Sequence, residues 1–325
     1  MKVKDWLTKN WFYLIVFIVA LVVPAFMPNR YTFQIVIMSC LMAVGALSFN
    51  LLLGYTGQAS LAHGAFFGIG AYGASILTLN LGWSFWIALP VGAAIAALVG
   101  MVVGIPTLRT RGAYFAIATM CLGEIITLIA GNWIELTGGH NGLVGIPTPT
   151  PIRIPGLFTI NFDDQTAQYY LVLAFLIIVI FFMRRLVYSL KGLTFMAIRN
   201  NELLAEAIGI NTFRTKLLSF VVSTFIVGMA GGVYASLIGS ISPTVASLKV
   251  TFDFLLFTLL GGMATLAGPV IGAFGLLILM EYLQFLQEYQ MIIFGALLVA
   301  VIVYFPRGFM GAYMKLKSKM KKAGN

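Results

Sequence analysis

Few side chains in this sequence could do chemistry inside an apolar environment. The two histidines, His63 and His140, are far apart and have no cysteine or carboxylate at metal-ligand spacing, so neither a metal site nor a cofactor is expected. Glu124 lies in the middle of an apolar run, with Asn50 as a polar residue in another run. An ionised carboxylate at such a depth must bond to a neighbouring helix or face a water-filled path. The sequence leaves both readings open.

The catalytic constellations of common enzymes are missing from the chain. It has no paired nucleophile and base and no glycine-rich phosphate loop of the Walker type, so it is not expected to be an enzyme or to bind ATP by that route. Ion-coupled transporters usually carry a denser relay of polar groups through the bilayer. The scarcity of such groups argues against that class as well.

The most informative stretch is a charged island from Arg199 to Lys216, between two apolar runs. Asn200 or Asn201 can cap a first helical turn, Gly209 can end the helix, and Asn211 or Thr212 can start the next one. Two acidic and four apolar side chains recur at helical spacing within it: Glu202, Glu206, Leu203, Leu204, Ala207 and Ile208. This pattern fits either an amphipathic turn on the membrane surface or a docking element for a cytosolic partner.

Composition places the island in an integral membrane protein. The chain is 60% hydrophobic and only 9% charged, with a mean hydropathy of +0.99. Soluble domains are about one-quarter charged. The net charge of +10 sits in loops and at both ends, as membrane orientation requires, and does not indicate nucleic-acid binding. Cys40 and Cys121 both lie in apolar runs and are expected to be buried free thiols.

The hydropathy pattern predicts an all-α protein with ten membrane spans, each needing roughly 20 apolar residues. Residues 245 to 288 are too long for one crossing and are divided at the break from Gly261 to Pro269. The predicted spans are 11–27, 31–53, 59–79, 84–105, 112–131, 169–188, 217–239, 245–262, 268–287 and 289–305. If 245–262 were re-entrant, the count would become odd.

Charge favours ten spans with both termini in the cytoplasm. In that arrangement every Lys and Arg except Arg30, Arg153 and Lys249 lies on the inner side. The whole chain, 1–325, then forms a single transmembrane domain in the cell membrane. The basic tail, 307–325, is expected to lie along anionic lipid headgroups.

Several segments resemble the LivM-type permease subunit of branched-chain amino acid ABC importers. They run from Leu53 to Tyr72, Arg111 to Glu124, Gly138 to Pro147, Arg199 to Asn211, Lys216 to Phe220, Ile241 to Pro243, Gly261 to Ala273 and Phe305 to Gly308. The resemblance covers residues 33 to 311, and its motifs are specific in combination. One departure is Ala264, where the family more often has glycine.

The resemblance implies the type II importer fold, a second related permease subunit, two cytosolic ATPase subunits and an external solute-binding protein. The segment 189–216 would be the ATPase-coupling segment. Its contact residues would be Arg199, Asn200, Glu202, Leu203, Leu204, Ala205, Glu206, Ala207, Ile208 and Gly209. The four apolar side chains would dock, and the two glutamates would meet basic residues of the ATPase.

The resemblance also suggests where substrate arrives and crosses. The outer loop 132–168 and the segment at Ser242 and Pro243 would receive the binding protein, through Gly138, Gly139, His140, Asn141 and Gly142. Asn50 and Glu124 would be polar groups on the pathway. The substrate would be leucine, isoleucine or valine. A urea, short-chain amide or other amino acid permease of the same superfamily is the nearest alternative.

Overall fold

Long apolar helices dominate the protein. The computed structural model describes residues 21–24, 29–154 and 158–283, together with the isolated positions 295, 296, 299, 308 and 310. In this part of the chain, six helices are long and apolar enough to cross a membrane. They are α2 with its π-helical extension η1 (Arg30–Asn50 and Leu51–Thr56), α3 (His63–Leu81), α4 (Phe85–Thr107), α5 (Ala113–Asn132), α7 (Gln165–Val187) and α10 (Thr212–Ile238).

Two shorter helices follow α10. They are α11 (Leu248–Gly261) and α12 (Ala267–Tyr282), and the predicted break between Gly261 and Pro269 falls between them. At 1.5 Å per residue, α11 is about 21 Å long, shorter than the roughly 30 Å hydrocarbon core of a bilayer. Eight of the ten predicted spans thus correspond to helices. The predicted spans 11–27 and 289–305 and the basic tail lie largely outside the described residues.

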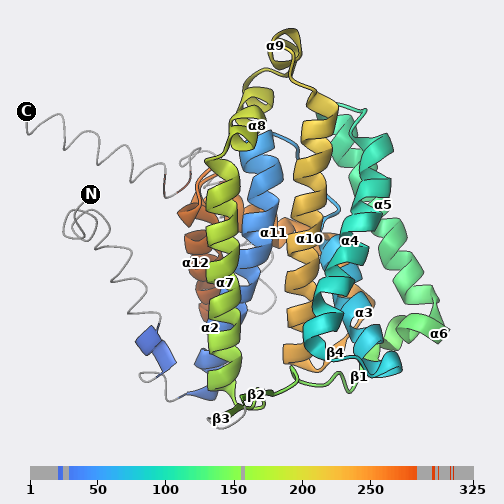
Figure 1. Cartoon of the computed structure of the whole chain (residues 1–325), viewed down its shortest axis with the longest axis vertical. Coiled ribbons are helices and arrows are strands. Elements are labelled where there is room, and N and C mark those ends of the chain that lie inside the picture. Colours follow the sequence, from blue (N-terminus) through green and yellow to red (C-terminus); the bar gives the residue numbers. More distant parts are fainter. Residues whose placement is uncertain are drawn as a thin grey trace, which may run out of the picture.

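Helix α10 lies at the centre of the bundle and packs against α2, α3 and α4 (Figure 1). Small residues allow this close packing. A methyl group added to Gly70 of α3 would lie 2.1 Å from the carbonyl oxygen of Gly228 in α10, and one added to Gly228 would lie 2.7 Å from the Ala96 side chain of α4. Glycines therefore let the backbones of these three helices approach closely.

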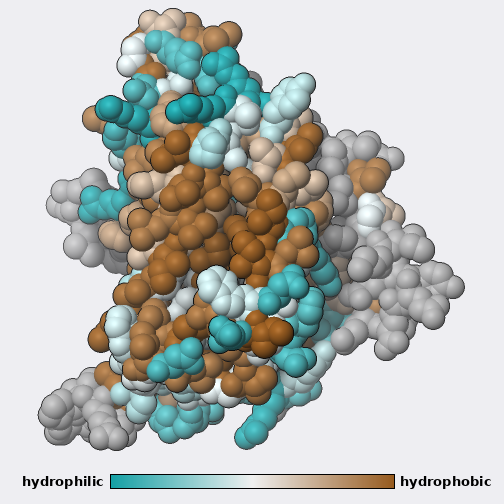
Figure 2. All heavy atoms as spheres, turned by 90° about the vertical axis from the view of Figure 1, so that its right-hand side faces the viewer, coloured by the Kyte–Doolittle hydropathy of each residue, from teal (hydrophilic) through white to brown (hydrophobic). Residues whose placement is uncertain are grey.

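The bundle has two distinct ends (Figure 1). At one end α8 (Leu190–Asn200) and α9 (Glu202–Ala207) extend beyond the long helices. At the other end lie two small sheets, in which β1 (Leu143–Val144) pairs with β4 (Ser240–Ile241) and β2 (Ile152–Ile154) pairs with β3 (Phe158–Ile160). Figure 2 shows a hydrophobic band between these ends on the face formed by α4 and α5. That band is the surface a bilayer would cover.

Two segments turn back into the bundle from opposite ends. After η1, residues 57–62 lead to the start of α3, where the Leu61 amide donates to the Thr119 hydroxyl of α5 at 3.0 Å. After β4, the 3-10 helix η3 (Pro243–Ala246) lies against Gly68 of α3. Gly68 is about 20 Å along α3 from the helix end at Leu81. Just beyond the two segments, the Gly64 amide of α3 donates to the Thr251 hydroxyl of α11 at 2.7 Å.

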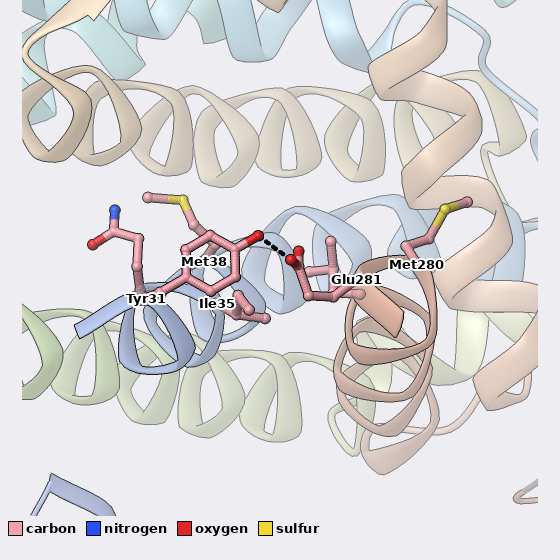
Figure 3. A pocket seen from close by; sticks show the side chains of 7 residues that line it. Tyr31, Ile35, Met38, Met280 and Glu281 are labelled. Atoms are coloured by element: carbon pink, nitrogen blue, oxygen red, sulfur yellow. Dashed lines mark hydrogen bonds between the residues drawn. The ribbon is translucent and has the colours of Figure 1, made fainter. Parts of the chain in front are cut away.

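A polar contact joins the start of α2 to the end of α12. Asn29 caps α2 by accepting a hydrogen bond from the Tyr31 amide at 3.1 Å. The Tyr31 hydroxyl donates to the Glu281 carboxylate across a small pocket of about 240 Å³ (Figure 3). Ile35, Met38 and Met280 contribute apolar surface to this pocket (Figure 3), which Gln34 and Leu277 also line. The bond links α12 to α2.

Candidate functional site

The α8–α9 end has a geometry set by local capping. Ser189 begins α8, Asn201 accepts from the Leu204 amide at 3.0 Å to begin α9, and Asn211 accepts from the Arg214 amide at 2.9 Å to begin α10. The prediction that asparagine caps these helices is confirmed at Asn201 and Asn211. Sequence reasoning missed α8 as a separate helix, because its eleven residues follow the apolar run of α7 with only one short break.

Gly209 ends α9 in the way the sequence predicted. Its φ is +88°, in the left-handed region that glycine adopts without strain. The Ile210 amide bonds to the Ala205 carbonyl at 3.0 Å and the Gly209 amide to the Glu206 carbonyl at 2.9 Å. This pair of bonds is the Schellman motif, which satisfies the last carbonyl groups of a helix. The short helix α9 is thus capped at both ends.

The apolar side chains of α9 point away from the bundle. Leu203, Leu204 and Ile208 are 65%, 61% and 69% exposed, and Ala207 is also exposed. Ala205, which the predicted contact set also includes, is buried and faces the chain itself. Burying large apolar side chains is favourable by about 1.5 to 3 kcal/mol each. We call Leu203, Leu204 and Ile208 the exposed triplet.

The two glutamates of α9 have partners inside the chain. Glu202 lies 2.6 Å from Lys216 Nζ and 3.6 Å from Arg111 Nε, and Glu206 lies 3.7 Å from Arg111 Nη2. Glu206 also accepts from the Thr212 hydroxyl at 2.7 Å. To bind basic residues of a partner, as expected from the sequence, these carboxylates would have to share or give up the bonds that they make within this chain. The exposed triplet, in contrast, is available for contact with another protein.

Lys216 and Arg111 connect α9 to two different helices. Lys216 belongs to the first turns of α10 and its side chain is only 2% exposed, whereas Arg111 precedes α5 and is 57% exposed. The sequence analysis placed both residues in family motifs and on the inner side of the membrane, but did not predict that either contacts α9. Arg111 lies about ninety positions before α9, so nothing local in the sequence could have paired them.

The remaining residues predicted for this segment are Arg199 and Asn200. Both are exposed at the end of α8, and the stem of Arg199 lies against the turn at Gly57. Gly57 has a φ of +76° and closes η1. A methyl group there would lie 3.2 Å from the Arg199 side chain. Arg199 therefore packs α8 onto the end of α2.

The outer residues predicted to receive a binding protein are brought together by the fold. Gly138, Gly139 and Gly142 have positive φ values and form the tight turn that contains η2 (Gly139–Asn141). The pairing of β1 with β4 places this turn beside Ser242, because a methyl group on Gly142 would lie 2.8 Å from the Ser242 Cα atom. His140 and Asn141 are exposed, and Pro243 is buried at the start of η3. This cluster lies at the end of the bundle opposite α9 (Figure 1).

One face of α5 lies against the two segments that turn back into the bundle, residues 57–62 and η3, which we call the re-entrant segments. The opposite face of α5 is exposed. Thr119 bonds to Leu61, and Thr127 donates to the Ala246 carbonyl at 3.0 Å. Glu124 points the other way and is exposed. Cys121 is exposed on the same face, so the prediction that it is buried is wrong, whereas that for Cys40 is confirmed. The exposed face continues through Tyr114, Ile117, Ile125 and Leu128.

Asn50 lies elsewhere and is fully engaged. Its side chain is fully buried, donates to the Thr265 carbonyl at 2.8 Å and accepts from the Ala264 amide at 2.9 Å. It therefore holds the break between α11 and α12 against the end of α2. This geometry favours a structural role for Asn50. Ala264 has a φ of +57°, the one positive value at a non-glycine among the described residues.

His63 is also a packed residue and not part of an acid–base pair. It is fully buried, its Nε2 atom lies 2.8 Å from the Ser223 hydroxyl, and its ring contacts Phe49 edge to face. Ser223 donates onward to the Ser48 carbonyl at 2.6 Å, so it accepts from the histidine. Within the described residues, no group of three His, Cys, Asp or Glu side chains could hold a metal ion.

A large groove lies between α4, α7 and α10. Its volume is about 750 Å³, and its lining is almost entirely apolar, with Leu89, Phe175 and Met229 as examples. Among the described residues that line it, Asp164 is the one with a charged side chain. A zwitterion needs both a donor and an acceptor at its two charged ends. Apart from Asp164, the described lining offers no charged group to such a ligand.

The fold and these sites define a polytopic membrane protein that presents a capped helix with exposed apolar side chains at one end and a glycine-rich turn at the other. Residues 31–302 match the family described as branched-chain amino acid transport system / permease component, and the chain belongs to this family.

Its curated relatives agree with this assignment. The chain is 31% identical to the high-affinity branched-chain amino acid transport system permease protein LivM of Escherichia coli, over 90% of this chain and 74% of that protein. It is 30% identical to the protein of the same name from Salmonella typhimurium, over 97% of this chain and 79% of that one. It is also 24% identical to the permease protein LivH of Escherichia coli, over 83% of this chain. No solved structure matches the chain.

Proposed function

We propose that this chain is a membrane-spanning subunit of an ABC importer that moves leucine, isoleucine or valine across the cell membrane. The relatives named LivM carry branched-chain amino acid transport in their names, and they are similar over nearly the whole chain. The similarity to LivH supports a second, related permease as the partner subunit. Two cytosolic ATPase subunits and an external solute-binding protein complete the proposed assembly.

The single observation that carries the coupling role is the exposed triplet on α9. Leu203, Leu204 and Ile208 expose apolar surface at the polar end of the bundle, beyond the part that a bilayer would cover. Exposed apolar side chains on a capped, ordered helix are typical of helix-in-groove recognition. We assign this end to the cytoplasm and the triplet to a groove of the ATPase. Both chain termini are assigned to the same side.

Motion of α9 would reach the membrane through its ion pairs. Glu202 and Glu206 both lie near Arg111, which leads directly into α5, and Glu202 also pairs with Lys216 at the base of α10. A displacement of α9 by the ATPase would therefore act on two spanning helices at once. Since α5 contacts both re-entrant segments, its movement would change the interior of the bundle.

The exposed face of α5 is the proposed boundary of the translocation path. A carboxylate at membrane depth is unfavourable against lipid and is expected to face protein or water. Glu124 is exposed in this chain alone, so the second permease subunit or an aqueous passage must lie beside it. We propose that substrate passes between the two permeases along this face. The cluster at Gly138–Gly142 and Ser242 would receive the loaded binding protein.

The test is uptake of radiolabelled leucine into proteoliposomes that contain this chain, its co-purified partners and the binding protein, with and without ATP. Uptake that requires both ATP and the binding protein is the expected result. Competition by isoleucine, valine or urea then identifies the substrate. Uptake that follows a proton or sodium gradient and ignores ATP would contradict the proposal.

A further inference from the structure

A second candidate site lies at the end of α7, on the same end of the bundle as α9. It is an open pocket of about 510 Å³ lined by Phe181, Arg184, Arg185, Tyr188 and Ser189. Sites for small molecules occupy roughly 300 to 1,000 Å³. Neither the coupling role of α9 nor the exposed face of α5 uses this pocket.

The pocket concentrates positive charge, and no described acidic residue pairs with it. Both arginines are exposed in the last turn of α7. In the part of the chain that the structure describes, the ion pairs involve Arg111 and Lys216 and neither of these arginines. Two adjacent guanidinium groups offer the forked donors that bind phosphate oxygens in pairs. The electrostatics therefore favour an anion with several oxygen acceptors.

The frame around the arginines is apolar and aromatic. The Arg185 guanidinium lies 5.6 Å from the centroid of the Phe181 ring. Phe181 is 61% exposed, Tyr188 is 78% exposed, and Ile178, one turn deeper along α7, is 64% exposed. Ile178 lies outside the pocket lining, so the exposed surface of α7 changes from charged at the pocket to apolar further along the helix, toward the part of the bundle that the bilayer covers. A free inorganic ion would use only the charged part of such a surface.

We propose that this pocket binds the headgroup of an anionic phospholipid. Its phosphodiester lies between Arg184 and Arg185, and its acyl chains run along Phe181 and Ile178. Basic pockets at the membrane boundary of transmembrane helices are suited to such headgroups. Placing this lipid in the inner leaflet rests on the proposed function, which sets the α8–α9 end in the cytoplasm. Lipid binding itself does not depend on that assignment.

The test compares lipids on the full chain purified in a neutral detergent. Phosphatidylglycerol, phosphatidylcholine and inorganic phosphate are titrated separately, while thermal unfolding and lipid retained in native mass spectra are recorded. Phosphatidylglycerol is expected to raise the unfolding temperature and to remain bound, whereas phosphatidylcholine and inorganic phosphate do neither. No transport or ATP hydrolysis enters the readout, so failure here is separate from failure of the proposed function.

Three variants make the test specific. Replacing Arg184 and Arg185 together by glutamine should raise the half-saturating concentration of phosphatidylglycerol at least about tenfold. Phe181→Ala keeps both charges and should weaken lipid binding to a smaller extent. Arg214→Gln, an exposed basic position at the start of α10, is the matched control and should leave binding unchanged.

Several results would overturn the proposal. Unchanged phosphatidylglycerol binding in the double glutamine variant would show that the pocket is not the site. An equal loss in Arg214→Gln would point to diffuse surface charge, and an equal thermal shift from inorganic phosphate would point to a simple anion site. Loss of ATPase co-purification in the double variant, with lipid binding intact, would assign the pocket to a protein contact.

Discussion

Lys216 Nζ lies 2.6 Å from the Glu202 carboxylate while the lysine side chain is only 2% exposed. This contact joins the first turns of α10 to α9, so the outward-facing helix is held by a charge buried in the bundle. A buried charge that keeps its partner is tolerated, but the same charge left alone is strongly destabilising. The pair therefore makes α9 dependent on the core helix beside it.

Replacing the Glu202 carboxylate should lower the unfolding free energy more than replacing the Lys216 side chain. Glu202→Gln leaves Lys216 buried without its counter-ion, and we expect a loss of about 2 to 3 kcal/mol in unfolding free energy, since Glu202 is partly exposed. Lys216→Met leaves Glu202 near Arg111 and should cost less. Thermal unfolding of the purified variants measures both. The combined variant should recover part of the Glu202→Gln loss, and strictly additive losses would rule out a direct pair.

Substituting the exposed triplet should uncouple the subunit from its ATPase without unfolding it. Leu203→Glu with Leu204→Glu replaces surface that would enter an apolar groove, and we expect at least about tenfold weaker co-purification of the ATPase. Leu193→Glu on α8 is a suitable control because that residue is 58% exposed and outside the triplet. If both variants retained the ATPase equally well, α9 would not be the docking helix.

Ala264→Gly should stabilise the protein. Ala264 has a φ of +57°, a conformation that costs an L-residue roughly 1 kcal/mol or more relative to glycine. We expect the unfolding temperature to rise by about 2 °C or more. Ala273→Gly is a control of opposite sign, because Ala273 is fully buried in α12 and glycine weakens a helix interior. A lower unfolding temperature for Ala264→Gly would show that the packing of the Ala264 methyl group stabilises the protein by more than its backbone strain destabilises it.

Asn50 should behave as a structural residue. Asn50→Leu removes both the donor to the Thr265 carbonyl and the acceptor for the Ala264 amide, and each backbone group left unpaired should lower the unfolding free energy by about 1 to 3 kcal/mol. Asn50→Asp keeps the acceptor and should be less harmful. Thermal unfolding and the KM for leucine separate the roles. A changed KM for leucine with unchanged thermal stability would instead indicate that Asn50 lines the translocation pathway.

Cys121 offers a direct probe of the exposed face of α5. It lies three residues before Glu124 on that face, whereas Cys40 is only 1% exposed. In the assembled importer, a membrane-impermeant thiol reagent should modify Cys121 at least about tenfold faster than Cys40. Cys121→Ser provides the background. Reaction only with membrane-permeant reagents would place this face in lipid.

Local chemistry explains which parts of the fold the sequence predicted well. Asn201, Gly209 and Asn211 mark helix ends through bonds to their own neighbours, so the bounds of α9 could be predicted from residue types. Which face of α5 is exposed could not be predicted from the sequence. Its core-facing and outward-facing residues are both apolar, and the pattern that separates buried from exposed faces in soluble helices is missing. Cys121 was misassigned for that reason.

Contacts between distant residues were the other limit. Arg111 meets Glu202 and Glu206 only because α5 and α10 begin at the same end of the bundle. The bonds from Asn50 to the break before α12 span more than two hundred residues. Neither contact leaves a periodic or compositional trace. Both require the fold before they can be recognised.

The caps at Asn201 and Gly209 have a consequence for how such transporters diversify. They fix the shape of α9 through backbone groups, and its inward anchoring uses Ala205, Glu202 and Glu206. The side chains of Leu203, Leu204 and Ile208 take no part in either task, so they are free to vary without refolding the segment. An importer could thus acquire a new motor subunit by changing three side chains on an unaltered adaptor, and designed pairs that ignore their natural counterparts could be made in the same way.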